Sequence, residues 1–170
     1  MTKSADLQAE IEAVIHDTAE RWNSQDFASV LELWDPDEAE PFYLAEEQRQ
    51  WFIGWAPLKA YLDPPKPTPV VQGIREEMRN IHVKEIAPGL VIAAWEMHFE
   101  MKIIGRQPIG EEGRVSAVLR KTPQGWRYIH WAESPMTAGM YLQTLMEKEV
   151  DQEKFKVIHA RSMARRGAST

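Results

Sequence analysis

The sequence contains no cysteine, so disulfides, thiolate nucleophiles, zinc ribbons and iron–sulfur clusters are excluded. It also has no HxH or HExxH spacing, which are common arrangements of metal ligands. Neither Gly105 nor Gly110 leads into a helix, as the glycines of phosphate-binding loops do. We therefore expect neither a metal nor an organic cofactor.

Basic charge and long apolar runs are scarce as well. The chain has 20 Lys and Arg against 26 Asp and Glu, whereas a nucleic-acid-binding protein needs a basic surface. No apolar run approaches the length of a membrane span, and residues 1–14 lack the apolar core of a signal peptide. We expect a cytoplasmic protein without nucleic-acid or membrane partners.

Tryptophan and methionine, by contrast, are abundant. Seven tryptophans and eight methionines occur in 170 residues, a length that suits one domain with a sizeable core. Such side chains pack well against flat, bulky ligands, but they also make an ordinary aromatic core. Composition alone favours the interpretation that these residues form an aromatic core.

Apolar spacing and turn residues predict helices first and strands later. Asp26 is placed to cap the second helix, and Ser134-Pro135 to begin the last one. The predicted helices and strands occupy residues 4–23, 27–34, 41–45, 50–53, 54–62, 78–86, 90–103, 115–119, 126–132 and 136–165. This order indicates an α+β domain whose antiparallel sheet curls around the first helices and leaves a concave face to be filled.

Alternation along the strands predicts which side chains meet on that face. In the last hairpin, Trp126, Tyr128 and His130 are expected on one side, because strand residues alternate between faces. In residues 90–103, Trp95, Met97, Phe99 and Met101 are expected inside. Residues Glu96, His98 and Glu100 would then form an ion cluster on the outer surface or at a dimer interface.

The order of elements and several local sequences resemble the SnoaL-like branch of the nuclear transport factor 2-like (NTF2-like) superfamily. The matching segments are Arg21–Phe27, Leu31–Trp34, Gly54-Trp55, Arg114–Ser116, Gly125–Arg127, His130 and Ser134. The resemblance covers roughly residues 8–134 and implies one domain over residues 1–170, with residues 136–165 as a C-terminal helical extension.

This resemblance implies a conical fold with a deep apolar pocket, commonly a homodimer through the outer face of the sheet. Members include cofactor-free isomerases, dehydratases, cyclases and lyases, but also non-catalytic subunits, so fold does not settle function. A ketosteroid-isomerase site is not matched, because Tyr43, Thr18 and Ser116 align where its carboxylate, tyrosine and aspartate would stand. Scytalone dehydratase is partly similar, with a tyrosine at the position of Tyr43 and an aromatic and a polar residue at those of Trp22 and Asn23.

The candidate catalytic residues are His130, Tyr43 and His82. His130 would transfer a proton as a neutral base whose pKa the apolar surroundings lower, unless it only orders the sheet. Tyr43 would donate a hydrogen bond or proton to substrate, unless it is a buried tyrosine bonded to a helix. His82, inward by the family pattern, is either the complementary acid or a core histidine. Expected substrate-binding residues are Trp22, Asn23, Trp95, Met97, Phe99, Asn80, Ser116 and Ser134.

These expectations give two hypotheses of different class. The first is a cofactor-independent lyase, dehydratase or isomerase that acts on a small, apolar, aromatic molecule. The alternative is a non-catalytic ligand-binding or scaffold subunit, as the small subunits of ring-hydroxylating dioxygenases are. A cavity with several convergent polar groups favours the enzyme, and a filled interior favours the scaffold. The Met-rich helix at 136–165 would act as a lid or as a dimer arm.

Overall fold

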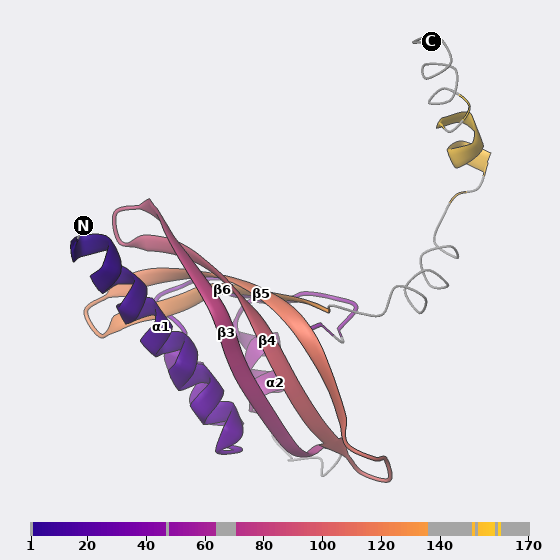
Figure 1. The fold of residues 1–170 in the computed structure, drawn as a ribbon, viewed down its shortest axis with the longest axis horizontal. Coiled ribbons are helices and arrows are strands. Elements are labelled where there is room, and N and C mark those ends of the chain that lie inside the picture. Colours follow the sequence, from indigo (N-terminus) through magenta and orange to yellow (C-terminus); the bar gives the residue numbers. More distant parts are fainter. Residues whose placement is uncertain are drawn as a thin grey trace. The chain divides into compact units, whose positions relative to one another are not determined.

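The computed structural model describes residues 2–46, 48–63, 71–135, 151, 153–158 and 160 (Figure 1). The chain divides into two compact units, Met1–Met136 and Thr137–Thr170. In the second unit residues 153–158 are helical, and the Asp151 carboxylate accepts the Lys154 backbone N–H at 3.1 Å. Most of the predicted extension 136–165 lies outside the described residues, so its role as a lid or dimer arm stays a prediction. No described helix is long and apolar enough to cross a membrane.

The helices of the first unit lie where the apolar spacing predicts them. They are α1, Thr2–Asn23, the 3-10 helix η1, Phe27–Leu33, and α2, Trp55–Leu62. Ile11 and Ile15, one helical turn apart on α1, are fully buried. Asp26 caps η1 as expected, because its Oδ1 accepts the backbone N–H of Ser29 at 3.3 Å.

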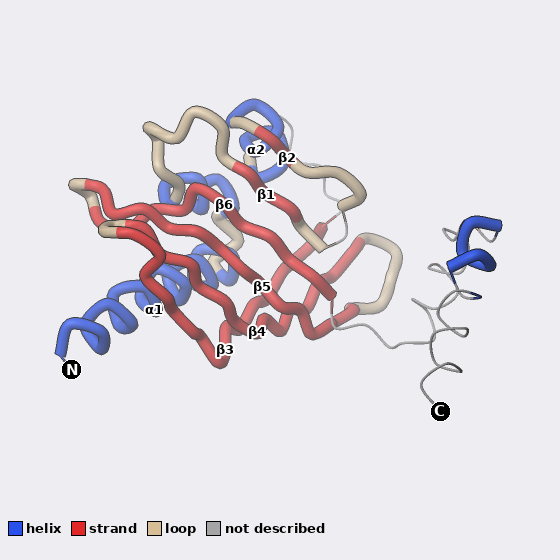
Figure 2. The backbone as a smooth tube through the Cα atoms, turned by 90° about the horizontal axis from the view of Figure 1, so that it is seen from above, coloured by secondary structure: helices blue, strands red, loops and turns tan. Residues whose placement is uncertain are grey.

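The strands form one curved, open sheet of six, in the order β2-β1-β6-β5-β4-β3 (Figure 2). Their bounds are Phe42–Leu44 for β1, Phe52–Ile53 for β2, Val71–Ala87 for β3, Leu90–Ile103 for β4, Ile109–Thr122 for β5 and Gly125–Pro135 for β6. Neighbours are antiparallel except for β1 and β6, which are parallel. The predicted α+β fold, a curved sheet wrapped around N-terminal helices, is confirmed. The sheet is mixed because β1 and β6 are parallel, and β3 begins at Val71 rather than Met78 and β5 at Ile109 rather than after Gly113.

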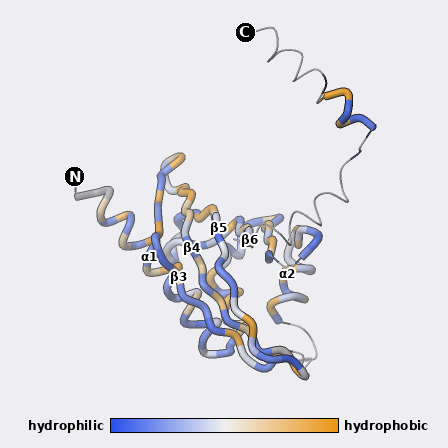
Figure 3. The backbone as a smooth tube through the Cα atoms, turned by 45° about the vertical axis from the view of Figure 1, so that its right-hand side comes forward, coloured by the Kyte–Doolittle hydropathy of each residue, from blue (hydrophilic) through white to orange (hydrophobic). Residues whose placement is uncertain are grey.

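The core lies between the helices and the inner face of the sheet, which is the face toward α1. Trp95 and Met97 of β4 are buried there, and the Trp95 ring meets that of Trp131 edge-on, with centroids 4.9 Å apart. β3 forms one edge of the sheet beside α1 (Figure 1) and is largely hydrophilic along its length (Figure 3). Polar side chains on an edge strand discourage pairing with other chains.

Two of the irregularities in strand pairing, both β-bulges, change the face on which a predicted site residue lies. On β3 the pairing with β4 shifts between Arg79 and His82, where Asn80 has a φ of 54°. On β6 the pairing with β5 shifts between Tyr128 and His130, so that Ile129 is the extra residue. One inserted residue moves every following side chain to the opposite face. Each bulge therefore reverses the side on which a predicted catalytic histidine lies.

Candidate functional site

Five predicted site residues lie on the inner side of the sheet. Trp22, Tyr43, Trp95 and Met97 are buried, and Phe99 is partly buried against the same core. The inward orientation expected for the β4 residues is confirmed. Their part in binding a substrate stays a prediction.

His130 lies on the outer face, so the prediction that it shares a face with Trp126 and Tyr128 is wrong. The bulge at Ile129 turns Trp131, instead of His130, toward the inside. The half-buried imidazole lies against two outer-face rings, 5.5 Å from the Trp51 centroid and 6.3 Å from that of Phe42. Burial lowers the pKa of His130 in the expected direction, but on the side of the sheet opposite Trp95.

His82 is also misplaced by the prediction. The bulge at Asn80 leaves His82 exposed, while Ile81 and Val83 pack against the core. Asn80 is exposed too, and its side-chain amide donates to Glu96 Oε2 at 2.8 Å on the outer face. The prediction that His82 and Asn80 point inward is therefore wrong.

The two serines lie away from the inner face as well. Val115 and Ala117 of β5 are buried inside, so Ser116 between them faces outward. Ser134 is exposed, and its Oγ accepts a hydrogen bond from Arg114 Nη2 at 3.3 Å. Neither serine meets Tyr43, as a shared substrate site would need.

Glu133 of β6 occupies an inner position that the bulge creates. Its Oε1 accepts the Trp131 indole N–H at 2.6 Å and the Tyr43 hydroxyl at 3.3 Å. Its Oε2 accepts the backbone N–H of Glu46 at 3.1 Å. Three converging donors suit a negatively charged acceptor and hold it in one place. The hydroxyl of Tyr43, expected to contact substrate, thus donates to a protein carboxylate.

Glu76 of β3 brings a second carboxyl group to the inner side. It precedes buried Met78 by two residues and pairs with Phe99 of β4, so its side chain faces the core. Its Oε2 is buried and has no hydrogen-bond partner among the described residues. Burial raises the pKa of Glu76 well above its ordinary value, and the negative charge of Glu133 raises it further.

The end of α1 fixes the backbone that carries Glu76. Asn23 Oδ1 accepts the Glu76 N–H at 2.7 Å, and its Nδ2 donates to the Glu76 carbonyl at 2.9 Å. Gln25, at a φ of 63°, makes the same pair of bonds to Ile74, at 3.0 and 2.6 Å. The two amides thus act as a neighbouring strand would and bind the edge of β3. Asn23 thus binds the backbone of Glu76, and its predicted contact with substrate stays a prediction.

The interior between α1, η1 and β6 is nearly filled. A space of about 10 Å³ is lined there by Thr18, Trp22, Val30, Trp34, Tyr43, Tyr128 and Trp131. It has room for one water at most and is too small for an organic substrate. The hydroxyls of Thr18 and Tyr128 share a hydrogen bond of 2.9 Å, and burial raises the pKa of Tyr128, so this phenol stays protonated.

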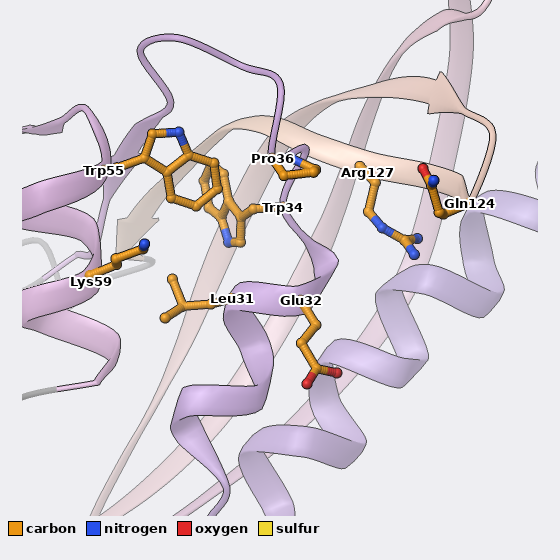
Figure 4. A pocket seen from close by; sticks show the side chains of 8 residues that line it. All are labelled: Leu31, Glu32, Trp34, Pro36, Trp55, Lys59, Gln124 and Arg127. Carbon is orange, nitrogen blue, oxygen red and sulfur yellow. The ribbon is translucent and has the colours of Figure 1, made fainter.

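Trp34 also lines a second, larger space that opens to the outside. This groove has a volume of about 520 Å³ and lies between η1, α2 and the turn from β5 to β6 (Figure 4). It does not include Glu76 or Glu133.

The outer face carries an ion cluster around His98, as expected, but its second glutamate is Glu112 rather than Glu96. His98 Nδ1 lies 2.9 Å from Glu112 Oε1, and its Nε2 lies 3.3 Å from Glu100 Oε1. Arg79 also binds Glu112. Within the described ranges, no group of three or more His, Asp or Glu residues is arranged to hold a metal ion.

Glu76 and Glu133 are the residues that the sequence-based prediction missed. Glu76 was overlooked because the predicted strand began at Met78, although Glu76 and Met78 have the spacing of two residues on one face. Glu133 was overlooked because regular alternation assigned the inner position to Ala132. A charged residue two positions after Trp131, at the end of an apolar strand, was the available signal.

Comparison with known proteins supports the fold. The profile of the SnoaL-like domain matches residues 11–138. A proposed dehydratase of the NTF2-like family from Streptomyces avermitilis has a TM-score of 0.67 at 15% identity, over 78% of this chain and 99% of that one. A proposed scytalone dehydratase from Novosphingobium aromaticivorans also has 0.67, at 13% identity, over 81% and 89%.

A hexachlorocyclohexane dehydrochlorinase, LinA type 2, has a TM-score of 0.63 at 14% identity, over 79% of this chain and 88% of that one. None of the curated protein sequences matches the chain. At these identities the structural similarity establishes a shared fold only.

Proposed function

Because the chain belongs to the SnoaL-like family, we propose that it is a cofactor-independent acid–base enzyme of the dehydratase, isomerase or lyase type. Its substrate would be a small, neutral, largely apolar and aromatic molecule. The observation that carries the proposal is the carboxyl oxygen Oε2 of Glu76, which is buried and lacks a hydrogen-bond partner in the described part of the chain. Such a group costs stability, and perturbed carboxyl groups of this kind are concentrated at functional sites.

The chemistry that suits Glu76 is proton transfer. Its raised pKa brings the equilibrium between carboxylic acid and carboxylate closer to neutral pH, where general acid–base catalysis is most effective. As the acid it donates a proton to the substrate, and as the carboxylate it removes one. A single residue that gives and recovers a proton consumes no cofactor.

Glu133 supports this role electrostatically. The donors from Tyr43, Trp131 and Glu46 keep its carboxylate in place, and its charge favours the acid form of Glu76. Negative charge at the site also disfavours an anionic substrate, which is why we propose a neutral one.

The half-buried rings around these carboxyl groups provide an apolar surface. Phe99 lies opposite Glu76 in the β3–β4 pairing. Phe52 and Tyr61 stack with their centroids 4.7 Å apart, and Tyr61 lies 5.4 Å from the ring of Tyr43. Flat aromatic surfaces bind a ring by dispersion and by offset stacking. This supports an aromatic substrate.

The proposal is tested by following proton transfer directly. A panel of enolisable aryl ketones and β-hydroxy aryl ketones is incubated with the protein in D₂O, and proton NMR detects deuterium uptake or loss of water. We expect Glu76→Gln to lower the rate by about 10²–10⁴-fold, because it removes the transferable proton but keeps the shape. Glu112→Gln, on the outer face, is the matched control and should react normally. Full activity of Glu76→Gln would refute the assignment.

A non-catalytic role is the second candidate, and the nearly filled interior favours it. The same panel separates the two functions. If no compound exchanges hydrogen or loses water and none binds, while Glu76→Gln leaves the fold intact, the scaffold role is supported. Hydrogen exchange of a substrate that is lost in Glu76→Gln would reject the non-catalytic role.

A further inference from the structure

The open groove outside the sheet has an apolar middle. Trp34 and Trp55 line it with Leu31 and Pro36. The Trp55 indole is held in place, since its N–H donates to the Glu38 carbonyl at 2.7 Å. The volume of about 520 Å³ lies in the range of about 300–1,000 Å³ usual for small-molecule sites. Trp55 is partly exposed, whereas Trp34 is only 2% exposed, so the Trp55 indole offers most of the surface for a flat aromatic ring.

Two cations lie at the sides of this apolar surface. In the view of Figure 4 the Trp34 indole lies between Lys59 of α2 and Arg127 of β6, and the Trp55 indole lies beside Lys59. Lys59 Nζ is 5.5 Å from the centre of the Trp55 ring, and Arg127 Nη1 donates to the Trp126 carbonyl at 2.9 Å. Among the described residues, neither cation forms an ion pair with a carboxylate.

The single carboxylate of the groove is already neutralised. Glu32 Oε2 accepts a hydrogen bond from Arg21 Nη1 at 2.8 Å, and Gln124 is uncharged. The groove therefore presents positive charge, although the whole chain carries a net charge of −6. This contrasts with the inner site, where Glu76 and Glu133 bring two carboxyl groups together.

We propose that this groove is a binding site for a small aromatic carboxylate, separate from the inner acid–base site. The ring would lie against Trp34 and Trp55, and the carboxylate would accept hydrogen bonds from Lys59 or Arg127. Both contacts use groups that the fold leaves available: the partly exposed surface of Trp55, Leu31 and Pro36, and two cations with spare N–H donors. The proposal does not depend on the activity of Glu76.

The test uses the full-length protein labelled with ¹⁵N and the probe 2-naphthoate. The indole N–H signals of the tryptophans report where the probe binds, and titration gives its dissociation constant. We expect shifts at Trp34 and Trp55 but not at Trp95 and Trp131. The neutral isostere 2-naphthamide should bind about 10-fold more weakly, because it lacks the charge.

Variants assign the charge to particular residues. Lys59→Met and Arg127→Gln should each weaken 2-naphthoate binding about 3- to 10-fold, and Lys84→Met on β3 should leave it unchanged. Unchanged binding in both groove variants would overturn the proposal. Equal affinity for the amide, shifts confined to Trp95 and Trp131, or no binding at millimolar probe would overturn it as well.

Discussion

Two glutamates on opposite faces of the sheet show how strongly environment decides the behaviour of one residue type. Glu76 faces the core, where burial and the charge of Glu133 raise its pKa. Glu112 faces outward, where the hydrogen bond from Arg79, followed by that from His98, lowers its pKa. The same carboxyl group thus has a raised pKa on one face and a lowered pKa on the other. The face of the sheet on which a glutamate lies therefore decides the direction in which its pKa shifts.

The largest difference between the faces should appear in stability when a tryptophan is removed from each. Trp131 is 3% exposed and contacts Trp95, Tyr128 and Tyr43, whereas Trp51 on the outer face is 43% exposed. We expect Trp131→Ala to cost about 3–5 kcal/mol of unfolding free energy, because it opens a cavity, and Trp51→Ala less than about 1 kcal/mol. Urea titration monitored by circular dichroism measures both. Similar losses would mean that the outer face is covered in solution.

The contributions of Glu76 and Glu112 to the free energy of unfolding should change with pH in opposite directions. A raised pKa means that the stability from protonated Glu76 is complete below its unfolded pKa, about 4.3, and is lost as pH rises through the folded value. Glu76→Gln should therefore match the parent protein at pH 4 and be more stable at pH 8, by about 1–3 kcal/mol.

Glu112 should behave in the reverse way. Because its pKa is lowered, its contribution exists above the unfolded pKa and disappears as pH falls through the folded value. Glu112→Gln should then be less stable than the parent at pH 7 and equal to it near the acid limit. Urea midpoints across the pH range give both curves, and curves of the same sign would contradict the assignment of faces.

The bulge that turns His82 outward can be tested through Asn80. Its φ of 54° lies in the left-handed region, which costs most side chains about 1–2 kcal/mol and costs glycine nothing comparable. We expect Asn80→Ala to lose about 1 kcal/mol and Asn80→Gly less than half of that. Denaturant midpoints measure the two. A glycine variant as destabilised as the alanine variant would show that β3 has no left-handed residue there.

The order of helices and strands could be predicted from the sequence because it depends on periodicity and turn chemistry, which are local. The last hairpin is an example: Thr122 and Gly125 close the turn by a side-chain hydrogen bond of 2.9 Å where the sequence placed it. For His82 and His130, the direction in which the side chain points depended on one single-residue insertion each. A bulge changes few local preferences but reverses every later position, so His82 and His130 were assigned to the wrong face.

The carboxyl groups of the candidate site were missed for a related physical reason. An inward glutamate is costly, so a pattern of apolar alternation assigns Glu76 and Glu133 to solvent. The structure places them inside because their backbones are fixed by other interactions, the amide of Asn23 in one case and the bulge before Trp131 in the other. Such costs are accepted at functional sites, and that is where predictions from local pattern fail.

The smallest expected effect concerns His130, which tests whether the second bulge exists in solution. Burial beside Phe42 and Trp51 lowers its pKa, so the unfolded chain binds the proton more tightly, and the stability from neutral His130 is lost as pH falls from about 6.5 through the folded pKa. NMR titration of the imidazole should give a pKa below 6.5, and His130→Gln should remove part of the pH slope in the urea midpoint. In Trp51→Ala, which exposes the ring, the pKa should move back toward 6.5. If the pKa of His130 were the same in Trp51→Ala as in the parent protein but changed in Trp131→Ala, His130 would lie on the inner face.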